Sequence, residues 1–409
     1  MYENKDNAFG PLSFPWFPRF KSTQRDHGRS PGADYHVNPA SKKTVCSTCG
    51  TARAGRYDAK IHRVRDVASA GTRIFLEFET WRLYCHRCQA VKQETLAWLA
   101  DSGRFTKRFE RDIGRQCREM SIARVADIHR LHWDQVRRME IAYMEDLLVQ
   151  HPPPKRLRAI GMDEVSIKKR HRYAIVVADL ERRRPIWMSE SPGRAEEDLD
   201  KFYVGLNARS RRGIKLAVMD MWKPFRHSTL RHVPNVRIVF DKFHVIKHLS
   251  DALDEVRRQE YKRVNENDRK FIKGQRYTLL SNKANLDLDG RRSLKLLLKA
   301  NKRLHKAYLL KETFGQLWDY NYPACARTFF EHWKAQLKWQ GLEPFEKFAA
   351  MIDRHWEGLV AYCNPDNKVS LGFMEGLNNK IRVIQRRAYG IKDQRYLKLK
   401  VLTSFIKDR

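Results

Sequence analysis

Two short, almost uninterrupted apolar runs constrain the fold of this chain more than any other feature. The segment Ile214-Lys-Leu-Ala-Val-Met leads directly into Asp220, and Val236-Arg-Ile-Val-Phe leads directly into Asp241. Continuous runs of this kind are typical of strands that are buried on both faces, whereas a strand with one solvated face alternates apolar and polar residues. We therefore expect a sheet that is covered by helices on both sides.

Three more strands are predicted before these two, over Arg158–Ser166, Tyr173–Asp179 and Pro185–Ser189. Because these segments follow one another closely, they indicate an antiparallel meander. A helix is predicted from Ala195 to about Arg212, with its apolar residues on one face. The order βββ-α-β-α-β predicts an α/β fold with a mixed sheet and helices packed on it.

The charge of the chain indicates its partner. The sequence has 81 Lys and Arg residues against 48 Asp and Glu, a net charge of +33. It lacks both a run of about 18 apolar residues and an N-terminal signal pattern, so we expect neither membrane insertion nor secretion. A basic chain of this kind is predicted to bind nucleic acid.

Four of the seven cysteines form two C-x-x-C pairs, Cys46-Ser-Thr-Cys49 and Cys85-His-Arg-Cys88. Two such turns can present four thiolates to a tetrahedral zinc ion, and four thiolates leave no open position for catalysis. We therefore predict structural zinc, with an unmetallated or redox pair as the alternative. The alternating residues of Arg73–Glu79 predict a β ribbon between the pairs. The remaining cysteines are expected to be buried thiols: Cys117, Cys325 and Cys363.

The segments on either side of the cysteine pairs differ in character. Residues 1–40 are rich in Pro, Gly and aromatic residues without periodicity, which predicts a poorly ordered arm. Residues 104–150 have helical patterning, with Ser121 as a cap and a second helix from Trp133. Arg137 and Arg138 on the second helix favour a helix-turn-helix that reads DNA, although an ordinary helical hairpin would have the same pattern.

The second half of the chain is mostly helical. From 246 to 365 no strand pattern matches those above, which indicates an all-helical insertion. Its tryptophans are expected to be core residues, although stacking on a flipped base is an open alternative: Trp318, Trp333 and Trp339. A final helical segment follows and begins with a basic helix around Glu375.

Three carboxylates are candidates for a shared metal site. Asp163 and Asp220 each lie where a buried strand meets solvent, and Glu375 lies on the polar, basic face of its helix. Each has an ordinary explanation, since a strand-end aspartate often caps a loop and a helix face is often solvated. Glu164 should point to the opposite face of the sheet from Asp163. Asp241 is either an auxiliary carboxylate or the true second ligand, but we favour Asp220 because its strand is expected beside the first.

The sequences of several segments resemble those of the ISL-three family of bacterial insertion-sequence transposases. The segments that carry this resemblance are Gly161-Met-Asp163-Glu-Val-Ser166, Val218-Met-Asp220-Met221, Phe240-Asp-Lys-Phe-His-Val-Ile-Lys247, Glu375-Gly-Leu-Asn-Asn-Lys380 and Arg386-Arg-Ala-Tyr-Gly390. The cysteine pairs and the helix pair also match that family's N-terminal zinc and helix-turn-helix segments. The resemblance covers roughly residues 40–405 and leaves out the first 40.

The resemblance implies a ribonuclease-H-like fold, with Asp163, Asp220 and Glu375 as a catalytic triad that binds Mg²⁺ or Mn²⁺. Such a site would cleave DNA at the ends of an insertion sequence and join the 3′-hydroxyl to target DNA. Contacts with DNA are expected from Arg137 and Arg138 at the element ends. His244 is expected either to contact DNA or assist the site, or to be a structural histidine. Contacts with phosphates near the active site are expected from Lys380, Arg382, Arg386 and Arg387.

The resemblance also implies a homodimer or larger assembly on double-stranded DNA, in the bacterial cytoplasm and associated with the nucleoid. The domains would be an arm (1–40), a zinc-binding module (41–100), a helix-turn-helix (101–151), a catalytic core (155–245 and 366–409) and the helical insertion (246–365). Two other functions share these features: a catalytically idle, transposase-derived DNA-binding regulator, and a structure-specific nuclease.

Overall fold

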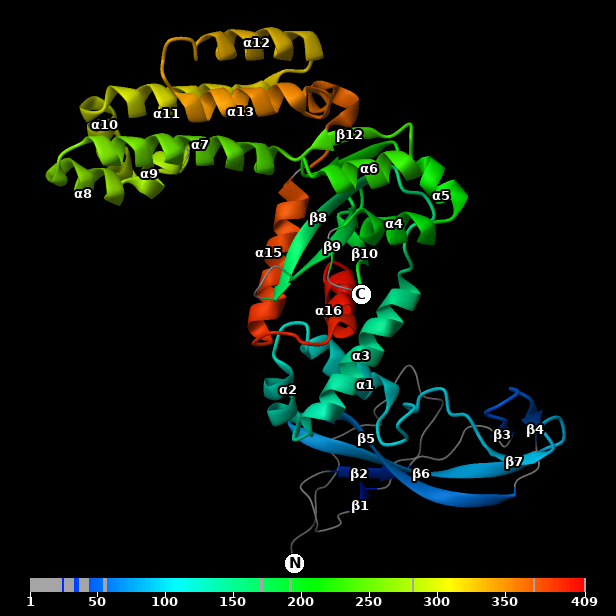
Figure 1. Ribbon diagram of the computed structural model, residues 1–409. Coiled ribbons are helices and arrows are strands. Elements are labelled where there is room, and N and C mark those ends of the chain that lie inside the picture. Colours follow the sequence, from blue (N-terminus) through cyan, green and yellow to red (C-terminus); the bar gives the residue numbers. More distant parts are fainter. Residues whose placement is uncertain are drawn as a thin grey trace, which may run out of the picture. The chain divides into compact units, whose positions relative to one another are not determined.

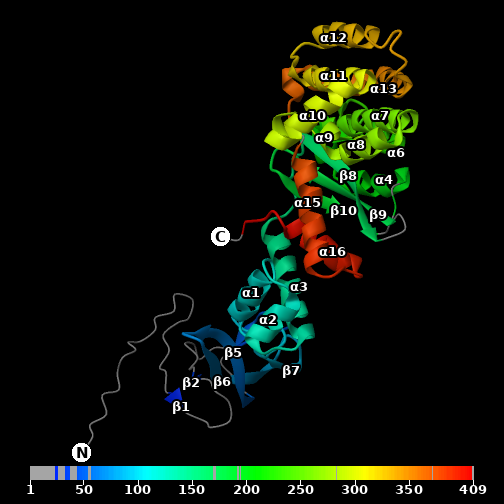
Figure 2. The same ribbon diagram turned by 90° about the vertical axis from the view of Figure 1, so that its left-hand side faces the viewer.

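The computed structural model describes residues 24–25, 33–36, 44–53, 57–168, 172–190, 193, 195–281, 283–370 and 372–407 (Figures 1 and 2). The chain divides into two compact units, Met1–Asp146 and Leu147–Arg409. No helix in the described part of the chain is both long enough and apolar enough to cross a membrane.

The first unit is built on a long antiparallel hairpin of β5 (Asp58–Ser69) and β6 (Thr72–Cys85). The turn between them is tight, with Ala70 and Gly71 both at positive φ. This hairpin confirms the ribbon that alternation predicted between the cysteine pairs. β7 (Ala90–Gln93) adds to β6, and a small separate sheet pairs β3 (Thr44–Val45) with β4 (Ala52–Arg53).

The prediction of a poorly ordered arm over residues 1–40 is wrong for part of it. β2 (Ala33–His36) lies parallel to β6, and β1 (Gln24–Arg25) pairs with β2. The buried carboxylate of Asp34 accepts a hydrogen bond from Arg63 Nε on β5 at 2.7 Å, which ties this strand to the hairpin. The other residues of the expected arm lie outside the described residues.

Three helices complete the first unit: α1 (Lys107–Gln116), α2 (Ile122–His129) and α3 (Trp133–Gln150), of which α3 continues past the unit boundary. The predicted cap is confirmed, since the Ser121 hydroxyl accepts a hydrogen bond from Arg124 N at 3.3 Å. α2 ends at Arg130, which has the left-handed conformation with φ +50°. Buried Val125 and Val136 join α2 to α3 in one core.

The second unit contains a five-stranded sheet in the order β10-β9-β8-β11-β12. β8 (Ala159–Lys168), β9 (Arg172–Asp179) and β10 (Arg184–Met188) form an antiparallel meander. β11 (Leu216–Met219) lies parallel to β8, and β12 (Arg237–Phe240) lies parallel to β11. The mixed sheet and the strand succession predicted from the sequence are both confirmed.

Both faces of this sheet are covered, as the continuous apolar runs predicted. One face packs on α4 (Glu196–Gly205) and α6 (Lys223–His232). The other packs on α15 (Gly372–Arg387) and α16 (Gln394–Thr403). The single helix predicted over 195–212 is wrong, because the chain leaves the helix at Gly205-Leu206 and the Asn207 side chain caps a new helix, α5 (Ala208–Gly213).

Between β12 and α15 the described residues form helices and no strand. The long helix α7 (Lys242–Arg263) packs against α11 (Lys302–Phe314) and α13 (Glu343–Arg354), as Figure 1 shows. The other members are α8 (Glu266–Gly274), α9 (Arg276–Leu280), η1 (Lys283–Asn285), α10 (Leu288–Ala300), η2 (Gly315–Asp319), α12 (Pro323–Ala335), α14 (Trp356–Val360), η3 (Ala361–Cys363) and η4 (Pro365–Asn367).

Two expectations about single residues in this helical segment are wrong. Trp318 and Trp333 are buried as predicted, but Trp339 is 99% exposed in the turn after α12. Cys117 and Cys363 are buried as predicted, whereas Cys325 is exposed at the start of α12.

Candidate active site and metal centre

The strand register brings three aspartates to one level of the sheet. Gly161 of β8 is opposite Val218 of β11, so Asp163 and Asp220 are each two residues further along neighbouring parallel strands. Met219 is opposite Phe240 of β12, so Asp241 follows at the same level on the third strand. Because neighbouring strands are about 4.8 Å apart, three carboxylates converge on one edge.

The sequence indicated that Asp163 ends a strand. In the structure it lies within β8, because this strand continues to Lys168. Its carboxylate is 7% exposed and faces α15, on the same face of the sheet as Val165. Its Oδ1 accepts a hydrogen bond from Glu164 N at 2.7 Å, and its Oδ2 accepts one from Asn378 Nδ2 at 2.6 Å. Met162 belongs to the core on the other face of the sheet. Because side chains alternate along a strand, Glu164 points to the same face as Met162 and away from Asp163, as predicted.

Glu375 is in the first turn of α15, close enough to this edge for its negative charge to act on Asp241. Leu377 and Ile381 anchor the helix in the core, as predicted, and leave Glu375 exposed on the other side. Gly161 allows α15 to approach β8 closely, since a Cβ at Gly161 would lie 2.8 Å from Met374 Sδ. Asn378 is a site residue that sequence reasoning missed. Its spacing of three residues from Glu375 places both near one helix face and was the available signal.

Asp220 and Asp241 are held by the chain that follows each strand. Asp220 Oδ1 accepts a hydrogen bond from Met221 N at 2.6 Å, and Asp241 caps α7 by accepting one from Phe243 N at 3.0 Å. His244, in the first turn of α7, has its Nδ1 at 3.9 Å from an oxygen of each aspartate. The structure therefore brings Asp241 and His244 to the same edge as Asp220 and does not choose between the two aspartates.

The carboxylates destabilise one another's charged forms. Burial raises the pKa of Asp163 to about 6, partly offset by His244, the Glu164 N–H and the Asn378 amide. Burial also raises the pKa of Asp241, and the negative charges of Asp220 and Glu375 contribute to that increase. A cation at this edge would relieve the repulsion.

The side chains at this edge have the chemistry that divalent metal ions require. The donors are carboxylate oxygens, which suit Mg²⁺ or Mn²⁺. Of the buried polar atoms that lack a hydrogen-bond partner among the described residues, two belong to residues at this edge, His244 Nδ1 and Asn378 Oδ1. Within the described chain, only the four cysteines bring three or more ligand atoms within 4.8 Å of one another. The carboxylate oxygens at this edge are therefore further apart than that. A spread set leaves room for the water and phosphate oxygens that Mg²⁺ retains.

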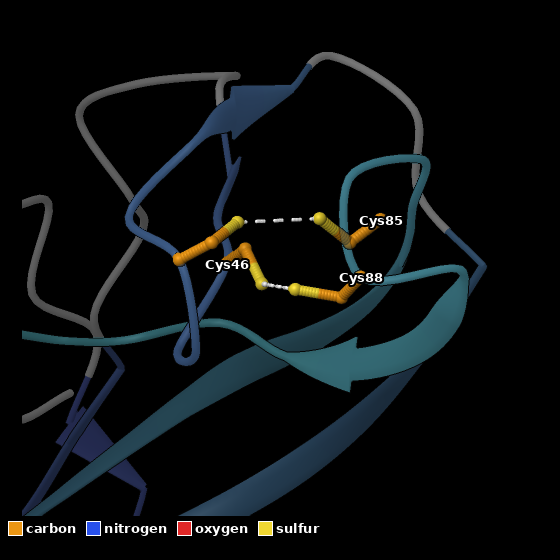
Figure 3. A group of neighbouring side chains, drawn as sticks. Cys46, Cys85 and Cys88 are labelled. Carbon is orange, nitrogen blue, oxygen red and sulfur yellow. Dashed lines mark hydrogen bonds between the residues drawn. The ribbon is translucent and has the colours of Figure 1, made fainter.

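The second site is the cysteine cluster of the first unit. Cys46 and Cys49 lie in the turn after β3, and Cys85 and Cys88 lie at the end of β6 and the turn after it. Cys46 Sγ is 4.0 Å from Cys88 Sγ, and Cys49 Sγ is 3.4 Å from Cys85 Sγ. Figure 3 shows Cys46 and Cys88 facing each other, with Cys85 beside them. Sulfurs around a tetrahedral zinc ion are about 3.8 Å apart, so four sulfurs at these distances fit one ion.

The local hydrogen bonds prepare this cluster for a metal. The Thr51 hydroxyl and backbone lower the pKa of Cys49 to about 6, and the backbone of Cys49 and Thr48 lowers the pKa of Cys46. Hydrogen bonds from Cys88 to Cys49 and other cysteines raise the pKa of Cys88 to about 12. Zinc binding requires deprotonated thiols, so a zinc ion here would displace the protons that remain on the cluster.

The basic residues expected to contact DNA lie on two helices. Arg137 and Arg138 are in the first half of α3, where Arg137 lies over the ring of Trp133 at 5.7 Å. Arg138 is exposed. On α15, exposed Arg382 donates a hydrogen bond to Asn379 Oδ1 at 3.0 Å. Lys380 and Arg386 are also exposed, while Arg387 is half-buried.

Comparison with known proteins identifies the class of this chain. A family model described as a transposase matches residues 160–401, which include the sheet, the acidic edge and α15. A second model, described as the helix-turn-helix domain of transposase family ISL3, matches residues 94–143. The chain therefore has a transposase region preceded by a helix-turn-helix.

Relatives extend this likeness over almost the whole chain. The transposase for insertion sequence element IS1001 of Bordetella parapertussis is 32% identical over 383 residues, 93% of each chain. The transposase for insertion sequence element IS1557 of Mycobacterium tuberculosis is 27% identical and covers 88% of this chain and 85% of its own. The chain belongs to transposase family ISL3, which confirms the resemblance seen in the sequence.

Proposed function

We propose that this transposase binds the terminal inverted repeats of its insertion sequence and catalyses metal-dependent strand cleavage and strand transfer. The catalytic residues in this proposal are Asp163, Asp220 and Glu375. The observation that carries it is the strand register, which brings Asp163 and Asp220 to one level of two neighbouring parallel strands, below the first turn of α15. A mixed sheet in the order β10-β9-β8-β11-β12 supports a ribonuclease-H-like core at 155–245 and 366–409.

The three carboxylates would hold Mg²⁺, or Mn²⁺ in its place. When bound, two such ions supply an activated water or 3′-hydroxyl and stabilise the oxygen that leaves. Asn378 would help to orient Asp163 through its hydrogen bond to Oδ2, together with the bond from Glu164 N to Oδ1. His244 flanks both Asp220 and Asp241, with its Nδ1 at 3.9 Å from an oxygen of each.

DNA recognition is assigned to the basic residues. Arg137 and Arg138 would contact the element ends from α3, the second helix of the helix pair. Phosphates near the active site would be held by a group on α15: Lys380, Arg382, Arg386 and Arg387. The first unit would contribute a zinc-binding module (41–100) that supports the helix-turn-helix (101–151), with structural zinc on Cys46, Cys49, Cys85 and Cys88. Because both element ends are handled together, a homodimer or larger assembly on double-stranded DNA is part of the proposal.

The test is strand cleavage on a labelled duplex that carries the gene's own flanking ends, with magnesium. Wild type is compared with Asp163→Ala, Asp220→Asn and Glu375→Gln, with a gel shift as the binding control. Nicking at the element boundary by wild type alone, while every variant still binds, supports the proposal. Loss of a catalytic carboxylate should lower the cleavage rate by at least about 10³-fold, since each is a ligand to the reacting ions.

Other outcomes favour the other two functions. A wild-type protein that binds but never cuts, even with manganese, would be a DNA-binding regulator with an idle sheet. Cutting of branched or single-stranded DNA without defined ends and without strand transfer would indicate a nuclease. Cleavage that persists in the Asp220 variant alone would make Asp241 the second ligand, and Asp241→Asn is the matched variant.

A further inference from the structure

An open pocket of about 680 Å³ lies on the helical segment, away from the carboxylate edge. It is lined from α7, α8 and α9, and four of its six lining residues are cationic while none is acidic: Arg257, Lys270, Lys273, Gly274, Arg276 and Tyr277. Such a pocket favours an anion, because several cations converge on a concave surface where solvent screens them less than on an open one.

Ion pairs with a buried aspartate hold the arginines of the pocket in place. Arg257 is buried, and its Nε donates a hydrogen bond to Oδ1 of the buried Asp254 at 2.8 Å. Arg276 Nε is 3.4 Å from the same carboxylate oxygen, and Arg258 Nε, outside the pocket lining, is 3.6 Å from Oδ2, so one aspartate holds three guanidinium groups, two of which line the pocket. Asp254 compensates part of the positive charge and leaves an excess. Lys270 and Lys273 are exposed, and the structure gives neither of them an ion pair with a described residue.

Helix α7 sets the distance from this pocket to the acidic edge. Its N-cap is Asp241, and it continues without interruption to Arg263, so Arg257 is on the same helix as the edge residue. The 16 residues from position 241 to position 257 correspond to about 24 Å at a rise of 1.5 Å per residue. B-DNA advances about 3.4 Å per base pair, so this separation spans about seven base pairs.

We infer that this pocket is a second DNA-binding site, which holds the phosphodiester backbone of the duplex about seven base pairs from the phosphate at the carboxylate edge. The inference rests on the proposed function, because it takes DNA as the ligand of that edge. The openness of the pocket favours a continuous polymer over a free nucleotide. Its one aromatic residue, Tyr277, is 78% exposed at the rim and does not wall in a base.

The test compares two double variants that remove the same charge from the same helical segment of the full-length protein. Lys270→Ala with Lys273→Ala removes the two exposed pocket lysines. Lys295→Ala with Lys299→Ala removes two exposed lysines of α10 that do not line the pocket. All four lysines are exposed, so both variants should fold, and thermal melting checks this.

Binding to a duplex that carries the element ends is measured over a series of salt concentrations. The slope of log K against log salt should fall by about two for the pocket variant and by less than about 0.5 for the α10 variant. Ethylation of single phosphates should interfere with wild-type binding about seven base pairs from the cleavage site, and this interference should be lost in the pocket variant alone. Equal slopes for the two variants, or unchanged interference, would overturn the inference.

The two proposals fail in different ways. If wild type never cuts but the two slopes differ, the proposed catalysis fails and the pocket remains a DNA contact. If wild type cuts and the two slopes are equal, the proposed function stands and the pocket inference is wrong. Protection of Lys270 and Lys273 from acetylation by ATP, but not by duplex, would also overturn it in favour of a nucleotide site.

Discussion

At the scale of single residues, the buried carboxylate of Asp163 lowers the stability of the fold at neutral pH, and its proposed role as a metal ligand would explain why it is kept. The pKa of this carboxyl rises from 3.8 to about 6 in the fold, mainly through burial. The folded state therefore holds the proton more tightly than the unfolded state, and stability falls as pH rises from about 4 to 6. The cost is complete above about pH 6, and at 1.36 kcal/mol per pKa unit it reaches about 3 kcal/mol.

Asp163→Asn should therefore raise the free energy of unfolding at pH 7.5 by about 1–3 kcal/mol and change it little at pH 4. Asn378 can turn its amide so that its oxygen, which has no hydrogen-bond partner among the described residues, accepts a bond from the new amide. Urea unfolding in buffer without added magnesium measures the effect, with the more exposed Asp220→Asn as control. A lower free energy of unfolding for Asp163→Asn than for wild type at pH 7.5 would contradict this. It would show that the two hydrogen bonds to the Asp163 carboxylate stabilise the fold by more than its burial destabilises it.

The sequence correctly predicted that Asp163 and Glu164 point to opposite faces of the sheet, because alternation along a strand is a local property. It missed Asn378: the spacing from Glu375 indicated only a shared helix face, while the contact with Asp163 joins residues 215 positions apart and depends on how α15 lies on β8. The preference for Asp220 over Asp241 stays a prediction, since His244 Nδ1 lies 3.9 Å from an oxygen of each aspartate.

At the scale of elements, the packing of α15 on β8 determines whether Glu375 reaches the edge. Gly161 makes this packing possible, since a Cβ there would lie 2.7 Å from Leu180 Cδ2 and 2.8 Å from Met374 Sδ. Gly161→Ala pushes on flexible side-chain ends, so we expect a modest loss of activity. Gly161→Val should displace the helix and lower cleavage at least about 10²-fold, because an error of about 1 Å in a catalytic group has that effect.

DNA binding by the first unit should remain in the Gly161 variants, and a gel shift separates this outcome from general unfolding. Gly205→Ala is the matched control, because a Cβ at Gly205 meets nothing within 4 Å. Full cleavage activity in Gly161→Val would mean that α15 does not need this close approach.

Elements with a strong hydrophobic period were predicted well, and those fixed by tertiary contacts were not. All five strands of the second unit were predicted, two of them from nearly continuous apolar runs. The strand at Ala33–His36 has no such run and exists through its pairing with β6 and the Asp34–Arg63 ion pair. The exposure of Trp339 was also missed. The turn around it is held by Arg303 and Lys306 of α11, which bond to Gly341 O and Gln340 Oε1, and neither contact is visible in the sequence.

At the scale of the whole molecule, the division into two units predicts that a zinc ion bound by the cysteine cluster would stabilise only one of them. All four cysteines lie in Met1–Asp146, and the carboxylate edge lies in Leu147–Arg409. Structural zinc contributes about 10–16 kcal/mol of binding free energy that a small domain uses to fold. Cys85→Ser should therefore lower or remove one unfolding transition and leave the other at its original temperature in calorimetry, with loss of specific end binding.

Elemental analysis completes this prediction, because it separates zinc from the redox alternative. The purified wild-type protein should contain about one zinc ion per chain, and Cys85→Ser should contain almost none, since four thiolates bind zinc far more tightly than three. Cys325→Ser is the control, because Cys325 is exposed on α12 and lies outside the cluster. Wild type without metal, but with two fewer or four fewer free thiols under oxidising conditions, would instead make Cys46–Cys88 and Cys49–Cys85 the reacting pairs, as their sulfurs are neighbours. In that case reduction and not chelation would shift the first transition.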